Sequence, residues 1–405
     1  ETIAFDAGAS FSTRNLAWDE RTGEVLLTET VDEYNDKYYT MNYPAHWYYG
    51  GMGQAAMNIG FTGQLTEVGN GAYSYSAAVN GINYEAEDLL LPGDELEIEK
   101  IISPTSSTYA FGWVTSVNGT QFEIIDEAGN PLTGQSGKFT VIRSGHRNLQ
   151  SAGIMNVTLM RNPLLDPVSE DLIPELGSNF LKSLQINNPW DEWRIINAGA
   201  VDYSDDWHVG CECGVNVSGG IYNPYRVNEK GVWRTKSSRT YLTGRNHQAE
   251  VTPRRQGFFT KFAPMYQKDS LLDAWEKDYN DWTYVAEVTQ YSPYGFELEN
   301  KDALDRYSAA QYGYNNTFPM AVGANTKYNE IGFDGFEDHF FKGCPYSSHF
   351  TFDDGARISA VHAHTGRYSI EVVGNSRVTM EKKLDCPSPG TGGGGTTTDP
   401  DDPSE

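Results

Sequence analysis

Short apolar runs separated by turn-forming residues make up most of the chain. Near its start, the polar residues Thr22 and Gly23 precede a β-branched and apolar run over residues 25–28. This arrangement is typical of a β-hairpin. A further strand is expected over residues 38–43, where an aromatic run ends at Pro44, and a helical turn is expected over residues 52–59. Residues 1–60 are therefore predicted to consist mainly of β-hairpins.

The densest series of turn signals lies in residues 61–143. Asn118-Gly119, the strongest short hairpin signal of the chain, separates an apolar run around Trp113 from another over residues 122–125. Apolar and acidic residues alternate over residues 94–98, and residues 139–142 form a last short apolar run. Several short strands joined by tight turns predict a small β-barrel inserted into the surrounding structure.

The remaining segments continue the β pattern with longer loops. Residues 144–330 mix strands with irregular stretches, and a short amphipathic helix is expected over residues 171–184. Residues 331–386 carry short alternating strands that predict a partial β-sandwich. Residues 387–405 form a Gly/Thr tract followed by an acidic Pro tract, which is typical of a linker. The predicted fold class is mainly β.

Composition narrows the possible partners. Hydrophobic residues make up 39% and charged residues 21% of the 405 positions, as in globular proteins. The formal net charge of -25 repels phosphate backbones and argues against a nucleic-acid partner. An acidic surface fits an exported protein or one that binds calcium. No apolar run reaches the roughly 18 residues that span a bilayer, so no membrane span is expected.

The two ends of the sequence suggest a piece of a longer, secreted protein. The chain begins at Glu1 rather than at Met, and its last residues lie in the linker-like tract. We therefore expect a mature or excised segment of a larger polypeptide.

The chain contains four cysteines, which could form disulfides, bind zinc or act as a nucleophile. Cys344 and Cys386 bracket the predicted sandwich and are expected to form a disulfide, which an exported protein permits. Cys211 and Cys213 are separated by one residue, so a bridge between them is strained. A zinc site would need a second pair with metal-ligand spacing, and the sequence contains none. A thiol nucleophile at Cys211 or Cys213, with His208 as base, is the alternative to structural cysteines.

Three stretches together resemble a known family. They are residues 18–27 with 43–47, residues 142–148, and residues 291–308 continuing to 312–316. They are similar to the very large, exported RHS/YD-repeat-like proteins of Bacteroidota. The resemblance implies tandem β-hairpins that coil into a strip, which can close into a shell. Residues 302–307 are similar to one repeat unit, with Asp305 at the position where the repeat usually has Gly.

A second resemblance concerns the C-terminal segment. Gly335-Phe336-Glu337-Asp338 and, further on, Ala363-His364-Thr365-Gly366-Arg367-Tyr368-Ser369-Ile370 are similar to jelly-roll modules of the carbohydrate-binding kind. In such modules the two stretches meet and hold a structural Ca²⁺ ion, which prefers oxygen ligands. The resemblance implies that the ligands are the carboxylate of Glu337 and the backbone carbonyls of Gly335, Thr365 and Arg367.

Other candidate chemistry has simpler explanations. His339, His349, His362 and His364 lie in one module, and His362 and His364 are expected to share a strand face, but the zinc-hydrolase motif HExxH is absent. The carboxylate pairs at residues 191–192 and 205–206 are interpreted as exposed turns rather than as a glycosidase pair. Trp and Tyr residues are expected to fill the core rather than to bind sugars. We predict no catalytic residues.

One basic stretch stands out in the acidic chain. It comprises Arg234, Lys236, Arg239, Arg245, Arg254 and Arg255. We interpret these residues as salt-bridge partners on a solvated β face, with a dock for anionic glycans or for the acidic rest of the protein as the alternative.

The sequence therefore predicts a non-enzymatic structural or adhesive segment of a secreted cell-surface protein. Its partners would be the rest of the same large polypeptide, other surface proteins or glycans. A carbohydrate-binding module is one alternative function. Part of an RHS-type shell for toxin delivery is another.

Overall fold

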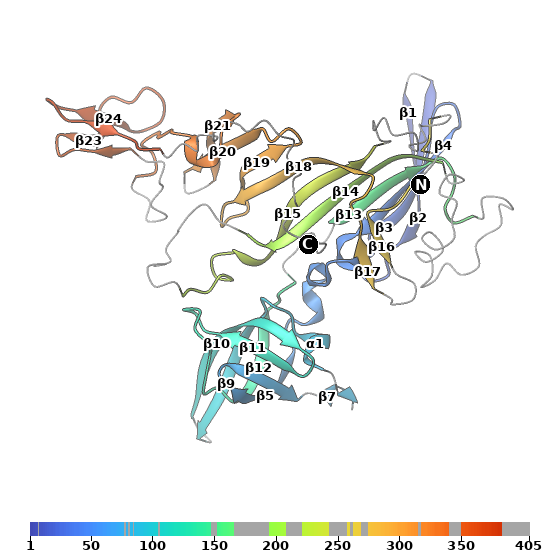
Figure 1. The fold of residues 1–405 in the computed structure, drawn as a ribbon, viewed down its shortest axis with the longest axis horizontal. Coiled ribbons are helices and arrows are strands. Elements are labelled where there is room, and N and C mark those ends of the chain that lie inside the picture. Colours follow the sequence, from blue (N-terminus) through green and yellow to red (C-terminus); the bar gives the residue numbers. More distant parts are fainter. Residues whose placement is uncertain are drawn as a thin grey trace, which may run out of the picture.

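The computed structural model shows a mainly β protein built around one large sheet (Figure 1). It describes residues 1–6, 8–76, 78–79, 82–83, 85–103, 106–146, 152–165, 194–207, 221–242, 257–259, 262–268, 274–314, 317–339 and 350–382. Eleven antiparallel strands form this main sheet, in the order β1-β2-β3-β4-β13-β14-β15-β18-β19-β20-β21. Their bounds are β1 (Thr2–Asp6), β2 (Ala9–Trp18), β3 (Val25–Val31), β4 (Lys37–Pro44), β13 (Gly153–Leu159), β14 (Ile195–Asp206), β15 (Lys230–Tyr241), β18 (Trp282–Tyr291), β19 (Glu297–Asp302), β20 (Tyr307–Gly313) and β21 (Phe318–Ala324).

Strands of the main sheet follow one another in the order of the chain. The hairpin expected around Thr22 and Gly23 joins β2 to β3, with Trp18 opposite Val25, and β4 ends at Pro44 as the sequence predicts. Local hairpin signals therefore account for much of the sheet, because neighbours in sequence are also neighbours in space. After β4, the 3-10 helices η1 (Ala45–Trp47), η2 (Gly50–Met52) and η3 (Ala55–Met57) lead away from the sheet.

A closed barrel is inserted between two adjacent strands of the main sheet. β4 pairs directly with β13, and the barrel occupies the chain between them. Its strands are β5 (Thr62–Gly69), β6 (Ala72–Ser76), β9 (Glu95–Ser103), β10 (Ser106–Asn118), β11 (Gln121–Ile125) and β12 (Gly137–Arg143). The short strands β7 (Ala78–Val79) and β8 (Ile82–Asn83) form a separate pair, and α1 (Ala86–Leu89) precedes β9.

Alternation along the barrel strands fills its interior. The expected Asn118-Gly119 hairpin joins β10 to β11, and Phe122 and Ile124 of β11 are buried. Leu96 of β9 and Phe139 of β12 meet them in one apolar cluster. Side chains with a period of two point to the same side of a strand, so these residues line the inside of the barrel.

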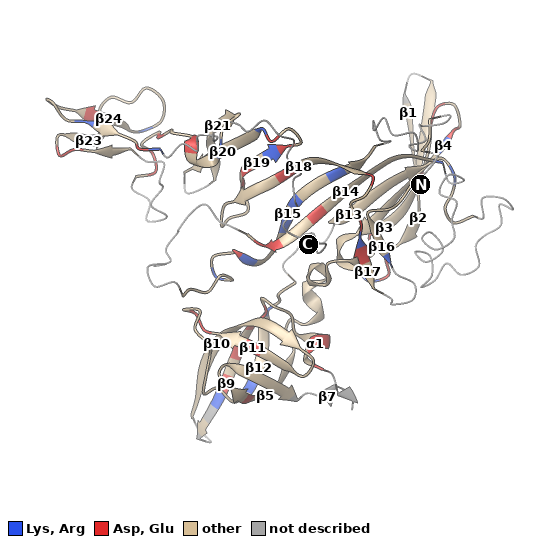
Figure 2. Ribbon diagram, in the orientation of Figure 1, with Lys and Arg blue, Asp and Glu red and all other residues tan. Residues whose placement is uncertain are grey.

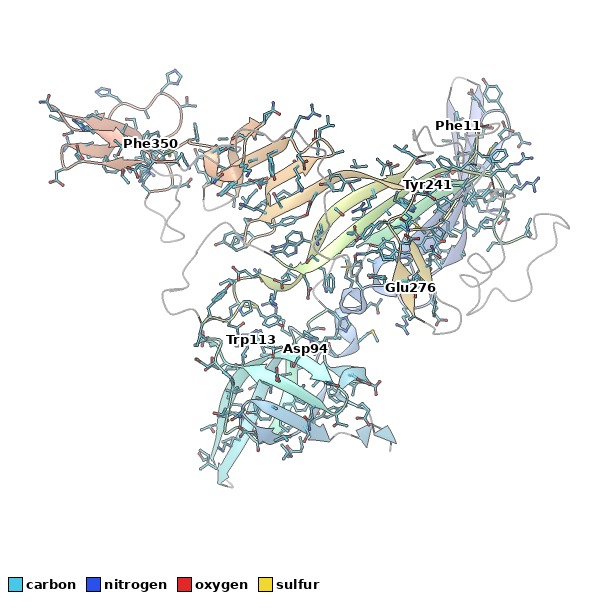
Figure 3. All side chains as sticks on the ribbon, viewed as in Figure 1. Phe11, Asp94, Trp113, Tyr241, Glu276 and Phe350 are labelled. Atoms are coloured by element: carbon cyan, nitrogen blue, oxygen red, sulfur yellow. The ribbon has the colours of Figure 1, made fainter. Side chains whose placement is uncertain are left out.

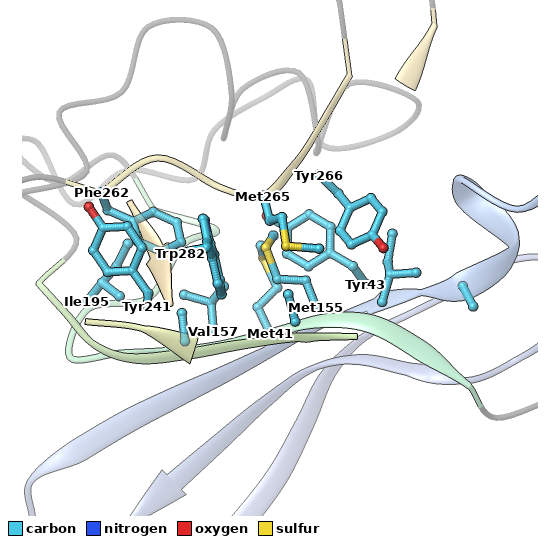
Figure 4. Packing of buried hydrophobic residues seen from close by; sticks show 14 of the residues in the cluster. Met41, Tyr43, Met155, Val157, Ile195, Tyr241, Phe262, Met265, Tyr266 and Trp282 are labelled. Atoms are coloured by element: carbon cyan, nitrogen blue, oxygen red, sulfur yellow. The ribbon is translucent and has the colours of Figure 1, made fainter. Parts of the chain in front are cut away.

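The core of the main sheet lies on one face, under a two-stranded ribbon. β16 (Tyr266–Lys268) and β17 (Trp275–Lys277) form this ribbon, which we call the β16–β17 ribbon. Figure 4 shows Met265 and Tyr266 packing down onto Met41, Met155 and other side chains of the sheet.

One turn type recurs at the hairpins. In the turn after β19, Asp302 Oδ1 accepts the N–H groups of Leu304 at 2.8 Å and Arg306 at 3.1 Å, and Asp305 has φ +55°. Asp305 thus takes the left-handed conformation that favours glycine. Two backbone bonds also close this turn: the N–H of Asp302 donates to the carbonyl of Arg306, and the N–H of Asp305 donates to the carbonyl of Asp302. Equivalent bonds close the turns at residues 32–36, 126–130 and 292–296, whose fourth residues are Asn35, Gly129 and Gly295.

We expect Asp305→Gly to stabilise the protein by about 0.5 kcal/mol. The left-handed backbone costs a non-glycine residue about 1–2 kcal/mol, while the extra entropy of glycine in the unfolded chain costs about 0.5–1 kcal/mol. Urea unfolding measures the difference. Asp305→Ala is the control, since it loses the side chain and keeps the strain. Equal stability of the Gly and Ala variants would contradict the explanation.

Two small sheets make up the described part of the C-terminal segment, which we call the C-terminal module (residues 331–339 and 350–382). β22 (Thr351–Phe352) pairs with β25 (Val378–Thr379), and β23 (Ala356–Ser359) pairs with β24 (Ser369–Val372). The 3-10 helix η5 (Tyr328–Glu330) precedes the module. The helix expected over residues 171–184 and all four cysteines, Cys211, Cys213, Cys344 and Cys386, lie outside the described residues.

Candidate functional site

The carboxylate of Asp202 lies on the buried, otherwise apolar face of the central strand β14. Ala198, Ala200 and Asp202 are all buried, and two-residue spacing places their side chains on the same face. Asp202 is only 3% exposed, so its charge needs partners. Figure 2 shows acidic and basic segments on the neighbouring central strands β14 and β15.

Asp202 accepts hydrogen bonds from two hydroxyl groups. Ser237 on β15 donates to Oδ2 at 2.8 Å, and Tyr266 on β16 donates to Oδ1 at 2.8 Å. The hydroxyl oxygens of Tyr49 and Tyr266 are 3.1 Å apart, and the Tyr49 oxygen accepts the N–H of Tyr203 at 3.1 Å. The chain of bonds therefore runs from the backbone through two phenols to the carboxylate.

The electrostatics of this cluster keep both phenols neutral. Burial raises the pKa of Tyr49 to about 12. Burial also raises the pKa of Tyr266 far above its usual range, and the nearby Tyr49 and the charge of Asp202 add to the increase. Both residues therefore remain hydrogen-bond donors at neutral pH.

Two cations complete the cluster. Lys277 Nζ on β17 lies 3.3 Å from Asp202 Oδ1, and Arg239 Nε on β15 lies 3.9 Å from Oδ2. The Arg239 guanidinium carbon lies 4.0 Å and the Lys277 ammonium 4.9 Å from the centre of the Tyr279 ring. Burial lowers the pKa of Lys277, but the charge of Asp202 and the contact with Tyr279 outweigh this effect, so the pKa ends above its usual value. Lys277 is therefore held as a cation.

We call Asp202, Ser237, Arg239, Tyr266 and Lys277 the central charge cluster. Its members come from β14, β15, β16 and β17, so it fastens the β16–β17 ribbon to the main sheet. Two hydroxyl donors and two cations surround the carboxylate, which suits a structural link between strands.

The basic stretch of the sequence is only partly where we expected it. Arg239 belongs to the central charge cluster, and Arg234 is buried at 7% exposure, so the interpretation of these two residues as part of a solvated face is wrong. The reason is that both guanidinium groups pack over tyrosine rings, Arg234 over Tyr291 and Arg239 over Tyr279. Arg245, Arg254 and Arg255 lie outside the described residues.

A second buried carboxylate, Asp94, lies where the barrel meets the main sheet (Figure 3). Its Oδ2 accepts hydrogen bonds from Asn58 Nδ2 and from the N–H of Leu91, both at 2.8 Å. Its Oδ1 accepts the N–H of Gly145, and Ser144 Oγ donates to Asn58 Oδ1. We call these five residues the barrel joint. Asn58 precedes the first barrel strand and Ser144 follows the last, so the joint holds both passages of the chain together.

The barrel joint requires glycine at position 145. A Cβ atom there would lie 2.6 Å from the carbonyl oxygen of Pro92 and 3.1 Å from the backbone nitrogen of Asp94. The backbones can approach this closely only without a side chain.

A further contact ties the barrel to the sheet through residues 221–229. Asn223 Nδ2 donates to the carbonyl of Asp126 in a barrel turn at 2.9 Å, and Arg226 pairs with Glu127 at 2.6 Å. On the other side, Asn228 Nδ2 donates to the carbonyl of Pro293 in the turn after β18 at 2.9 Å. The barrel is thus attached to the main sheet at two separate places.

The two stretches of the expected calcium site meet in the C-terminal module. Glu337 Oε1 accepts the N–H groups of Arg367 at 2.7 Å and Tyr368 at 2.8 Å. Gly366 has φ +87°, and a Cβ atom there would lie 2.4 Å from Glu337 Oε1. Only glycine allows the carboxylate this close to the turn. Of the four expected ligands, Glu337 therefore contacts the stretch that contains Thr365 and Arg367. The fourth, Gly335, lies two residues before Glu337 in the chain.

The histidines are arranged differently from the expectation. His362 and His364 lie in a bend between β23 and β24, so the prediction of a shared strand face is wrong. Strand β23 ends at Ser359, and the bend that follows leads to the turn at Gly366 next to Glu337. His339 Nε2 lies 2.7 Å from Asp334 Oδ2, and His349 lies outside the described residues.

The interpretation of residues 205–206 as an exposed turn is wrong, because both residues belong to strand β14 and Asp205 is half-buried. Asp206 ends β14 and pairs with Lys230 at 3.0 Å, whereas burial raises the pKa of Asp205. Residues 191–192 lie outside the described part.

Comparisons of the chain with protein-family models, with curated proteins and with solved structures found no match. Within the described ranges, no group of three or more His, Cys, Asp or Glu side chains is placed to hold a metal ion. No helix among these residues is long and apolar enough to cross a membrane.

Proposed function

We propose that this chain is a scaffold segment of a large secreted cell-surface protein, which holds the barrel and the C-terminal module on one continuous sheet. The observation that carries the proposal is the barrel joint, where Asp94 binds the chain on both sides of the barrel. A flexible tether would need no buried carboxylate at this point. A joint that contains one fixes the orientation of the inserted barrel relative to the sheet.

Other features support the same role. The buried charges of the central charge cluster bind one another across strands, as expected for a rigid support. The order of the main sheet follows the chain, which agrees with the hairpin strip that the resemblance to RHS/YD-repeat-like proteins implies. Export to the cell surface rests on that resemblance and on the acidic composition.

Two experiments test this proposal. ¹⁵N relaxation of the whole chain should give the same rotational correlation time for amides of the barrel, such as Phe122, and of the main sheet, such as Val157. A shorter correlation time for the barrel would contradict a rigid scaffold. An antibody against the barrel should label intact cells of the source organism, and labelling only after lysis would contradict the surface location.

Calcium is part of the proposal for the C-terminal module. We expect Ca²⁺ at 100 times its dissociation constant to stabilise the module by about 2.7 kcal/mol. Glu337→Gln should abolish this gain, because the amide oxygen still accepts the N–H groups of Arg367 and Tyr368 but carries no charge for the ion. Calorimetry with and without EDTA measures the effect.

The control for the calcium experiment is a substitution of another acidic residue in the same module. Glu371→Gln removes the exposed pair with Arg357 and should leave the calcium effect intact. A calcium response that persists in Glu337→Gln, or that is missing in the native chain, contradicts the site.

A further inference from the structure

Arg234 is a buried arginine, and two of its three guanidinium nitrogens are buried without an acceptor among the described residues. The residue is 7% exposed, and its Nε and Nη1 atoms are buried without a hydrogen-bond partner. Burial lowers the pKa of the guanidinium, but arginine remains charged at neutral pH. An unpaired charge in such a place is strongly unfavourable, and buried arginines are normally paired.

The neighbours of Arg234 use their polar atoms elsewhere. Its guanidinium carbon lies 5.1 Å from the centre of the Tyr291 ring, and the Tyr291 and Trp207 rings pack edge to face at 4.7 Å. The Tyr291 hydroxyl donates to the carbonyl of Thr235 at 2.8 Å, and Trp207 Nε1 donates to the carbonyl of Ser204 at 2.7 Å. The Tyr291 ring is therefore an apolar wall beside the cation, and Arg234 Nε and Nη1 have no hydrogen-bond partner among the described residues.

The pairing of β15 with β18 ends close to Arg234. The two strands pair as far as Ser237 and Glu287. Arg234 lies three residues beyond this point on β15, and it packs over the ring of Tyr291, the residue that follows Gln290 on β18. Gln290 Oε1 is also buried without a partner. The unpaired end of the two strands thus combines a charged donor and a neutral acceptor, both unused.

We propose that this end of β15 and β18 binds a small organic acid, with its carboxylate on Arg234 and a neighbouring hydroxyl or amino group on Gln290. Guanidinium groups bind the planar carboxylate well. A single cation beside the apolar cluster of Trp207, Val288 and Tyr291, whose Tyr291 ring it contacts, suits a monoanion better than a phosphate dianion. The site is independent of the scaffold role, because it touches neither the central charge cluster nor the barrel joint.

Thermal unfolding at constant ionic strength and neutral pH tests the site with three salts. Relative to sodium chloride, sodium acetate at a concentration that nearly saturates the site should raise the Tm of the native chain by about 2–4 °C. Sodium glycolate, whose hydroxyl can donate to Gln290, should raise it further. Arg234→Met should abolish both increases, whereas Gln290→Leu should abolish only the difference between glycolate and acetate.

The matched control is Arg226→Met, which removes an exposed arginine paired with Glu127 and should keep both increases. In sodium chloride, Arg234→Met should itself raise the Tm, because an apolar side chain replaces an unpaired buried charge. The proposal is overturned if acetate acts like chloride on the native chain, or if its effect persists in Arg234→Met. A lower Tm or failed folding of Arg234→Met in chloride also overturns it, since Arg234 would then already have a partner.

Discussion

Asp202→Ala should destabilise the main sheet by about 3–5 kcal/mol. The change leaves the half-buried cations Lys277 and Arg239 without the anion that both of them face. It also leaves Ser237 without its acceptor and Tyr266 with only the carbonyl of Val201 to accept its hydroxyl proton. Urea unfolding followed by tryptophan fluorescence measures the loss.

The control lies four residues further along β14. Asp206→Ala removes the pair with Lys230, whose side chains are 67% and 46% exposed, and should cost less than about 1 kcal/mol. If Asp202→Ala costs no more than this control, Asp202 does not fasten the β16–β17 ribbon to the sheet.

The pH dependence of the Asp202 effect has a definite sign. The folded protein raises the pKa of Lys277, so its stabilisation is complete below the unfolded pKa of about 10.4 and is lost as the pH rises through the higher folded pKa. The difference between the native chain and Asp202→Ala should therefore be constant near neutral pH and shrink in strongly alkaline solution.

The strand order was largely predictable from the sequence, because it depends on local signals. Turn residues such as Thr22-Gly23 and Asn118-Gly119 join strands that are neighbours in space. The barrel at residues 61–143 was predictable for the same reason, and its strands extend from Thr62 to Arg143. The mainly β fold class is thereby confirmed.

The buried charges were not predicted, because they depend on contacts between distant segments. Asp202 is one of 55 acidic residues, and its partner Lys277 follows much later in the chain. A weak signal was present, since Asp202 continues the inward alternation of Ala198 and Ala200. An acidic residue in the apolar phase of a strand indicates a buried ion pair, and the position of its partner is fixed only by the fold.

The same reasoning explains Arg234. Its position in a run of basic residues favoured a solvated face, but alternation along β15 and a bulge near Ser237 turn its side chain inward. Bulges shift the phase of a strand by one residue and leave no clear mark in the sequence.

Asp94→Ala should release the barrel from the main sheet and lower the stability of the chain by about 3 kcal/mol. The side chain is fully buried, and its loss leaves Asn58 Nδ2 and the N–H groups of Leu91 and Gly145 without their acceptor. Two of these donors belong to the passages that enter and leave the barrel. The effect should therefore fall on the connection rather than on the apolar interior of the barrel around Phe122.

Relaxation measurements separate these two effects. In Asp94→Ala the rotational correlation time of the barrel amides should fall below that of the main-sheet amides, while Phe122 keeps its native chemical shift. Asp88→Ala is the control, because Asp88 of helix α1 is an exposed acceptor for the N–H of Glu85, the residue before the helix, and its loss costs about 0.5–1 kcal/mol. If Asp94→Ala loses stability but the barrel and sheet still tumble together, the contacts of residues 221–229 hold the barrel without the joint. The rigidity on which the scaffold proposal depends would then come from Asn223 and Asn228 instead of Asp94.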